Sequence, residues 1–313
     1  MIRFNCLKTL TLLGLLTVSG HAQDITNLIG YWPANEGNGE LVANVVNADT
    51  NGKMNDATWS ADAEGHTGSA GDYAFRVTGD AGGGSHVEVP QTNAVFEEAT
   101  ILAWIKGKPT GDWTGIVYAR SEQAIGIDFS GGSGNLTYTW NDNSGDTWGF
   151  ESELAIPEDA WTMVAISITP DASTLYVGTT GDGEELKSAV NDIPHLTQTN
   201  DQGPFLFGVD ACCGDTRNFE GLMDDIAIWD VALTEEQIRS VWSGVATPLD
   251  VFDNSDPGAV VTSAQDFGRL AFLPGTQTLS LPVRNSGMTK PLSFSASVSV
   301  GMDHFTIVYC RAS

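Results

Sequence analysis

The chain has 313 residues, and its formal net charge is -26 because 40 Asp and Glu residues outnumber 14 Lys and Arg residues. This balance excludes a nucleic-acid partner, since phosphate binding requires clustered Lys and Arg, and it disfavours an acidic membrane surface. The length favours one large domain with something smaller beside it. Most carboxylates are expected to be solvated surface groups, but carboxylate oxygens are also ligands for calcium.

The first 22 residues have the pattern of a signal peptide. Arg3 and Lys8 precede or flank an apolar run at residues 10–18 that is shorter than a membrane span. Gly20 and Ala22 place small residues where a signal peptidase requires them, so cleavage is expected after Ala22. No later stretch is apolar for long enough to cross a bilayer. We therefore expect an exported, soluble protein without membrane insertion, secreted or held at the cell surface.

Short apolar and aromatic segments follow one another from residue 28 onward, separated by Gly, Asn and Asp. Such spacing is typical of antiparallel strands joined by turns. The expected strands are 28–32, 73–77, 86–90, 100–106, 115–119, 124–129, 136–140, 161–168, 174–177 and 205–209. No amphipathic helix is expected before Thr234. The pattern predicts an all-β antiparallel sandwich of two sheets.

The segment 219–242 predicts a strand followed by one short helix. Ile226 and Ile228 alternate with polar or small residues, which is typical of a strand with one buried face. Asp224 and Asp225 stand where the preceding loop meets this strand.

Helix signals begin at Thr234. Thr234 and Gln237 have the spacing of a capping box, and Gly244 would end the helix. One apolar face is expected from Ile238, Val241 and Trp242.

Three cysteines remain after the signal peptide: Cys212, Cys213 and Cys310. An exported protein meets an oxidising compartment, so a disulfide between the adjacent Cys212 and Cys213 is expected. Two reduced thiols, or a pair between one of them and Cys310, are the alternatives. Zinc is disfavoured because adjacent thiolates span a tetrahedron poorly.

Nine segments in fixed order resemble a known family: LIGYWPANEGNG, DTNGKMNDAT, YAFRVTGDAGGGSHVEVP, ATILAWIKG, GIVYAR, AWTMVAISIT, TLYVGT, FLFGVD and FEGLMDDIAIWDVALTEEQI. They resemble the laminin-G-like domains of the concanavalin A-like lectin/glucanase superfamily over residues 28–242. The most specific parts are the G-x-[IM]-D-D-x-x-[IV]-[WY] strand and the A-L-[ST]-x-x-[EQ]-I helix. The resemblance implies a jelly-roll sandwich for residues 24–246.

Domains of this family often hold one structural calcium ion. The resemblance places its ligands at Glu36, Asp49, Asn51 and Asp224, on loops that would converge to supply the required oxygens. In the alternative interpretation, Asp49 and Asn51 close a turn and Asp224 caps a bulge.

Catalysis is not expected. Glucanases of this fold carry an E-x-D-x-x-E strand whose alternation directs the carboxylates into one cleft, and the chain lacks that pattern. His66, His86, His195 and His304 each stand alone in the sequence, without a nucleophile–base motif.

Tryptophans in or beside polar loops indicate a binding role instead. Trp113, Trp140 and Trp148 could stack on sugars while polar loop groups bind the hydroxyls. The alternative is that each is half-buried at the rim of the sandwich. Loops 79–85 and 210–218 are further rim candidates.

The character of the sequence changes after Gly244. Residues 247–257 are expected to be a linker. Residues 258–313 resemble the opening of an immunoglobulin-like repeat but are too few for its about seven strands, so a small, incomplete β-sandwich segment is expected.

Two functions follow from these features. The first is an exported, non-catalytic binding module for a glycan or for a cell-surface or matrix protein. The second is a structural or adhesion segment without a small ligand. A glucanase-type enzyme is a third, less favoured possibility.

Overall fold

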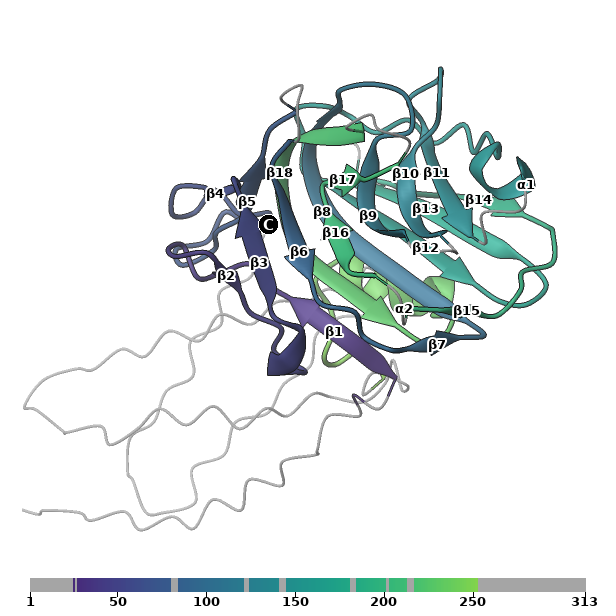
Figure 1. Cartoon of the computed structure of the whole chain (residues 1–313), viewed down its shortest axis with the longest axis horizontal. Helices are drawn as coiled ribbons and strands as arrows, with labels where there is room; N and C mark the ends of the chain where they lie inside the picture. The colour runs from purple at the N-terminus through teal and green to yellow at the C-terminus, as the bar shows by residue number, and fades with distance from the viewer. Residues whose placement is uncertain are drawn as a thin grey trace, which may run out of the picture. The chain divides into compact units, whose positions relative to one another are not determined.

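The computed structural model describes residues 25, 27–79, 84–120, 124–140, 145–180, 184–200, 203–212 and 217–252. These residues form a nearly all-β domain in which two large antiparallel sheets face each other (Figure 1). The predicted sandwich is confirmed. The chain divides into two units, Met1–Ala264 and Gln265–Ser313. The expected signal peptide, residues 1–22, and the expected immunoglobulin-like segment, residues 258–313, lie outside the described residues.

The nine-stranded sheet has the order β14-β13-β12-β8-β18-β5-β4, and β1 and β17 also pair with β18. Its strands are β1 (Leu28–Trp32), β4 (Thr58–Trp59), β5 (Phe75–Val77), β8 (Ala99–Pro109), β12 (Thr162–Ile168), β13 (Ser173–Thr179), β14 (Leu186–Asn191), β17 (Val209–Asp210) and β18 (Arg217–Trp229).

The seven-stranded sheet has the order β11-β10-β9-β16-β6-β3-β2, and β7 and β15 form a separate pair. These strands are β2 (Leu41–Val42), β3 (Gly52–Asn55), β6 (His86–Val89), β7 (Val95–Phe96), β9 (Gly115–Arg120), β10 (Ala124–Phe129), β11 (Leu136–Trp140), β15 (Gln198–Thr199) and β16 (Phe205–Phe207). Every strand expected between residues 28 and 209 is present, with shifts at the ends and with 205–209 divided between β16 and β17.

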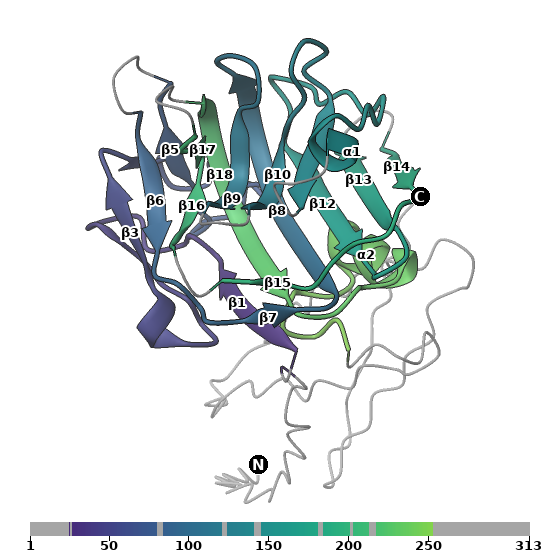
Figure 2. The same ribbon diagram turned by 45° about the vertical axis from the view of Figure 1, so that its right-hand side comes forward.

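The main core lies between the two sheets, where side chains from their inner faces interlock. Trp32 and Phe207 meet there edge to face, with ring centroids 5.1 Å apart. A second apolar cluster covers the outer face of the nine-stranded sheet, where α2 (Glu235–Trp242) packs on β12 and β13 (Figure 2). The strand β18 is therefore buried on both faces. Ile226 and Ile228 enter the main core, while Ala227 and Trp229 enter the second cluster. The expectation of one buried face was wrong, because the second apolar cluster, to which α2 and the segment 249–252 contribute, covers the other.

The signals at the ends of α2 are confirmed. Thr234 caps the helix, and Gln237 Oε1 accepts a hydrogen bond of 2.9 Å from the Thr234 amide, completing the capping box. Gly244 follows in the left-handed region with φ 68°. The described part of the expected linker, 247–252, instead packs on the domain, because Val251 is 1% exposed in the second cluster.

Two shorter helical segments are also present, the 3-10 turn η1 (Ala48–Thr50) and the single turn α1 (Gly145–Trp148), which sequence patterning did not predict. None of the described helices is long and apolar enough to cross a membrane.

Candidate functional site

A pocket of about 240 Å³ lies on the outer face of the seven-stranded sheet. Its floor follows from strand alternation. Val117, Ile127 and Tyr138 point into the core, so their neighbours point outward. The outward-facing floor residues are Tyr118 and Arg120 of β9, Asp128 of β10 and Thr139 of β11.

Two of the three predicted sugar-stacking tryptophans line this pocket. Trp113 lies in the loop before β9, and Trp148 ends α1; their rings meet edge to face with centroids 5.4 Å apart. Trp148 is 42% exposed, whereas Trp113 is partly buried. A Cβ at Gly131 would lie 2.5 Å from Trp113 Cε2, so the indole needs a glycine beneath it. Trp113 thus supports Trp148, and Trp148 presents an open face.

The third tryptophan does not reach this surface. Trp140 is fully buried in the core, and its Nε1 donates a hydrogen bond of 2.7 Å to the Leu196 carbonyl. Stacking with a ligand is not supported for Trp140, because alternation along β11 directs its side chain inward.

A buried carboxylate holds two arginines at the side of the pocket. Asp210 is fully buried and binds Arg120 through two hydrogen bonds, of 2.7 and 3.0 Å. Its Oδ2 also accepts a bond of 2.9 Å from Arg217 Nη1. The arginines are fixed by this sharing, which places both guanidinium groups at the pocket wall.

Asp128 is a second buried carboxyl group in the pocket, and it is 1% exposed. Burial, and then the negative charge of Asp210, raise its pKa well above the ordinary value, although Arg217, Arg120 and a hydrogen bond with Thr139 lower it. Its Oδ1 is buried without a hydrogen-bond partner among the described residues. Burial also raises the pKa of Tyr118 well above its ordinary value.

Cys212 lines the same pocket. It is disulfide-bonded, with a partner that lies outside the described residues, as Cys213 and Cys310 both do. The pairing with Cys213 stays a prediction.

Three of the four predicted calcium ligands lie in the loops that follow β1. Glu36 Oε1 accepts a hydrogen bond of 3.1 Å from the Ala43 amide, and Asn51 Oδ1 accepts one of 2.7 Å from the next amide, that of Asn44. The other Glu36 oxygen, Oε2, is buried and has no partner among the described residues. Asp49 is exposed on η1. An orphaned buried carboxylate oxygen beside these loops fits a cation.

The fourth predicted ligand, Asp224, accepts hydrogen bonds from two backbone amides. Its Oδ2 accepts a hydrogen bond of 2.8 Å from the His66 amide, and its Oδ1 accepts one of 2.8 Å from the Asp225 amide. The pairing of β18 with β8 shifts register between Asp224 and Ala227, and Asp225 has φ 44°. Asp224 thus caps a bulge, and both of its carboxylate oxygens accept backbone hydrogen bonds. The calcium site with all four ligands stays a prediction.

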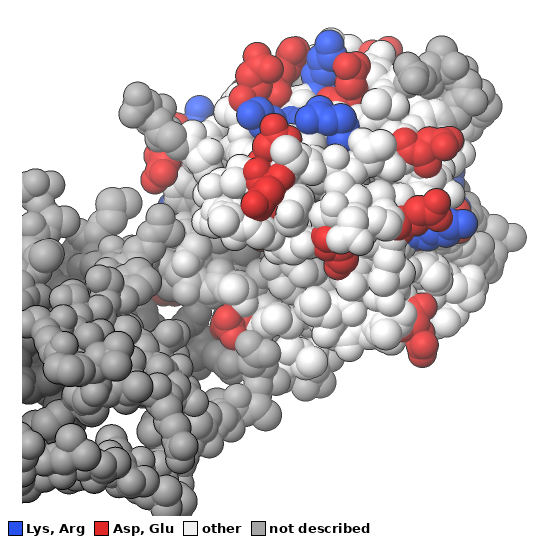
Figure 3. Space-filling view, turned by 90° about the vertical axis from the view of Figure 1, so that its left-hand side faces the viewer, with Lys and Arg blue, Asp and Glu red and all other residues white. Residues whose placement is uncertain are grey.

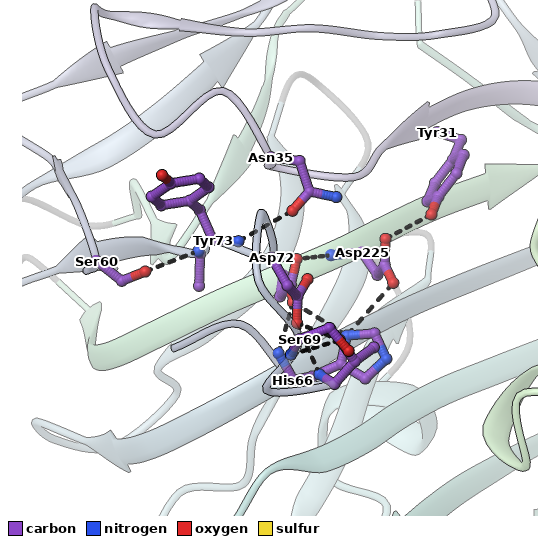
Figure 4. Close-up of polar contacts among 11 residues, drawn as sticks. Tyr31, Asn35, Ser60, His66, Ser69, Asp72, Tyr73 and Asp225 are labelled. Atoms are coloured by element: carbon purple, nitrogen blue, oxygen red, sulfur yellow. Dashed lines mark hydrogen bonds and ion pairs between the residues drawn. The ribbon is translucent and has the colours of Figure 1, made fainter. Parts of the chain in front are cut away.

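Asp224 belongs to a cluster with His66, Asp72, Asp225 and Tyr31. Figure 4 labels the last four of these residues. His66 Nδ1 lies 3.0 Å from Asp224 and 3.3 Å from Asp225. The Tyr31 hydroxyl donates a bond of 2.5 Å to Asp225. His66 stands alone in the sequence, but in the folded protein it contacts two carboxylates.

Burial and mutual repulsion shape the protonation of this cluster. Burial, and then the charge of Asp224, raise the pKa of Asp225 to about 7. Burial also raises the pKa of Asp224. For His66, burial lowers the pKa, but the hydrogen bond to Asp224 and the surrounding carboxylates outweigh it, so the net shift is upward. The cluster therefore retains protons that free side chains would release.

A larger groove of about 760 Å³ opens beside this cluster, lined by His66, Trp161 and residues of β5, β8 and β18. Three basic residues, Arg76, Lys106 and Lys108, share the groove with four acidic residues, Glu64, Glu158, Asp159 and Glu220. Basic and acidic side chains also lie side by side on the face shown in Figure 3. Neither charge dominates, and among the described residues that line this groove Trp161 is the only tryptophan. The smaller pocket is therefore the better candidate site.

Sequence inspection missed Asp128, Arg120 and His66. A charged residue inside the apolar strand AIGIDF was an available signal for Asp128, because alternation places it opposite the core. Nothing local marks His66 or Arg120, since their partners lie far along the chain.

Comparison with known proteins gives a family and a fold. The family model described as the concanavalin A-like lectin/glucanases superfamily matches residues 81–239. Domain 4 of AbnA, an extracellular arabinanase from Geobacillus stearothermophilus solved with arabinotriose, matches with 17% identity and a TM-score of 0.51, over 69% of this chain and 98% of that chain. No curated protein sequence matches.

Two more distant structures are also similar. A mutant sialidase of Trypanosoma rangeli that displays trans-sialidase activity has 10% identity and a TM-score of 0.46, over 73% of this chain and 34% of that chain. Botulinum neurotoxin type C, whose cell entry depends on two ganglioside molecules, has 12% identity and a TM-score of 0.43, over 71% of this chain and 52% of that chain. The chain thus spans about a third of the sialidase. At these identities the likeness concerns the fold.

Proposed function

Because this chain belongs to the concanavalin A-like lectin/glucanases superfamily, we propose that it is a non-catalytic module that binds carbohydrate in the pocket beside Trp113 and Trp148. One observation carries the proposal. The exposed ring of Trp148 meets the ring of Trp113 edge to face, and both line a pocket together with polar side chains.

Sugars suit such a surface for two reasons. Their C–H faces stack on aromatic rings, and their hydroxyl groups exchange hydrogen bonds with fixed polar groups. The pocket, about 240 Å³, is below the range of about 300–1,000 Å³ usual for small-molecule sites. It would hold one unit of a glycan, with the rest of the glycan outside.

The place of action is proposed to be outside the cell. The signal-peptide pattern of residues 1–22 and the disulfide bond of Cys212 support this location. In this setting a glycan of a cell surface or matrix is the favoured partner.

A glycan array followed by calorimetry tests the function. The calorimetric panel comprises arabinotriose, xylotriose and cellotriose, which are neutral, and trigalacturonate, which is acidic. Arabinotriose is included because the arabinanase domain of the same fold was solved with it. We expect saturable binding of at least one array glycan and one panel member.

Trp148→Ala should weaken that binding about tenfold or more, which corresponds to about 1.4 kcal/mol. The matched control is Trp161→Ala, which removes a tryptophan from the larger groove and should leave binding unchanged. Loss of binding in Trp161→Ala alone would move the site to that groove. The absence of binding to every glycan of the array would overturn the proposed glycan binding and favour a structural or adhesion role.

A further inference from the structure

The floor of the Trp113–Trp148 pocket contains an incompletely bonded carboxyl group. Asp128 lines the pocket, is 1% exposed, and has one oxygen, Oδ1, without a hydrogen-bond partner among the described residues. Burying an unsatisfied polar atom costs free energy, so native proteins rarely keep one without a role. The terminal torsion of Asp is broad, and a small rotation would present a carboxyl oxygen to the pocket.

The charged neighbours of Asp128 are already occupied with each other. Tyr118 and Arg120 face it from β9, Asp210 from β17 and Arg217 from β18. Both guanidinium groups bind Asp210, and Arg120 Nη2 also donates to the Tyr118 hydroxyl at 3.1 Å. Both arginines bind Asp210, whereas Asp128 Oδ1 has no partner among the described residues, so Asp128 retains hydrogen-bonding capacity.

We propose that Asp128 hydrogen-bonds a hydroxyl group of a neutral saccharide held against Trp148 and thereby determines which sugars bind. The proposal rests on the glycan-binding function proposed above and goes beyond it by naming the selecting residue and the ligand class. A neutral saccharide is favoured because its hydroxyl groups match a carboxyl group that both donates and accepts, and because the strongly acidic chain as a whole repels an acidic glycan.

The protonation of Asp128 supports the same role. Its pKa is raised well above the ordinary value, first by burial and then by Asp210. A protonated carboxyl group both donates and accepts, as a sugar hydroxyl does. Asparagine has nearly the same shape and the same capacity, so it imitates the neutral acid without titrating.

Calorimetry with the neutral trisaccharide that binds best compares wild type, Asp128→Asn and Asp128→Ala. At pH 5 we expect Asp128→Asn to stay within about threefold of wild type and Asp128→Ala to bind at least tenfold more weakly. The control is Asp171→Asn, in the exposed turn between β12 and β13, which should change nothing. Trigalacturonate should bind wild type at least tenfold more weakly than the neutral sugar.

A pH series gives a readout that a merely structural role would not move. As the pH rises through the pKa of Asp128, wild-type affinity should fall, by up to about tenfold per pH unit, while the affinity of Asp128→Asn stays level. If Asp128→Ala fails to fold, the pH profiles of wild type and Asp128→Asn are sufficient to test the role of Asp128.

The outcomes separate the two proposals. Wild-type binding that is unchanged in Asp128→Ala, or that has the same pH profile in Asp128→Asn, overturns the role of Asp128 and leaves glycan binding intact. Preference for trigalacturonate overturns the neutral-saccharide assignment. Absence of wild-type binding to every panel member and array glycan overturns the proposed function and this inference with it.

Discussion

His66 Nδ1 lies 3.0 Å from Asp224 Oδ2, although 158 positions separate the two residues. The bond ties the loop before β5 to the bulge in β18, and the His66 ring stacks on Trp104 with centroids 4.4 Å apart. Asp225, within the bulge, lies 3.3 Å from the same imidazole nitrogen. A histidine between two carboxylates makes this junction sensitive to pH.

Stability should fall as the pH rises through about 7. The pKa of Asp225 is raised to about 7, so the folded protein holds a proton that the unfolded chain has lost above about pH 4. That contribution is fully present at low pH and is lost as the pH rises through the folded pKa. The raised pKa of His66 acts in the same direction. Thermal melting between pH 5 and 8 should reveal the decline.

Asp225→Asn isolates this effect, since asparagine tolerates the left-handed φ of 44° and can still accept the bond from Tyr31. The fall in melting temperature between pH 5 and 8 should be smaller in Asp225→Asn than in wild type, and the difference should be about 3 °C or more. Asp171→Asn should follow wild type. Parallel curves for Asp225→Asn and wild type would contradict the assignment.

Asp210→Asn should destabilise the fold. It leaves Arg120 and Arg217, whose side chains are only 19% and 22% exposed, without their shared negative partner. Breaking a buried ion pair costs about 3–5 kcal/mol, and partial solvent access places the expected loss at the lower end, about 3 kcal/mol. Chemical denaturation measures it. As a control, Glu185→Gln breaks the exposed ion pair with Lys187 and should cost less than about 1 kcal/mol of unfolding free energy. Equal losses in the two variants would show that the buried ion pairs of Asp210 stabilise the fold no more than an exposed pair does.

Thr234→Ala should cost about 1 kcal/mol. The Thr234 hydroxyl caps α2 by accepting from the Gln237 amide at 3.3 Å, and α2 covers the second apolar cluster. Thr234→Ser keeps the hydroxyl and should lie close to wild type in urea denaturation. A serine variant as unstable as the alanine variant would point to lost methyl packing instead of capping.

Calcium binding at the loops after β1 stays a prediction, centred on Glu36, Asp49 and Asn51. We expect calcium to raise the melting temperature and a chelator to lower it, since a ligand that binds only the folded state at about 100 times its Kd adds about 2.7 kcal/mol. Glu36→Gln should abolish the response. Asp224→Asn should lower the melting temperature yet keep the response to calcium, because Asp224 is bound to His66. Identical melting of wild type with calcium and with chelator would remove the site.

The strand pattern and the cap of α2 followed from the sequence by itself. Alternation of side chains and the spacing of Thr234 and Gln237 are local properties, set by two or four neighbouring residues. The same alternation in β10 shows that Asp128 faces away from the core.

Only the tertiary structure decided what Asp128 and Trp148 meet. Asp128 shares its pocket with Arg217 because strands far apart in sequence converge there, and Trp148 leans on Trp113 because the loops before β9 and after β11 end on the same side of the sheet. It also placed Asp224 within hydrogen-bonding distance of His66, 158 positions away. Sheet order and register fix these contacts, and both depend on packing between distant segments, which no short stretch of sequence encodes.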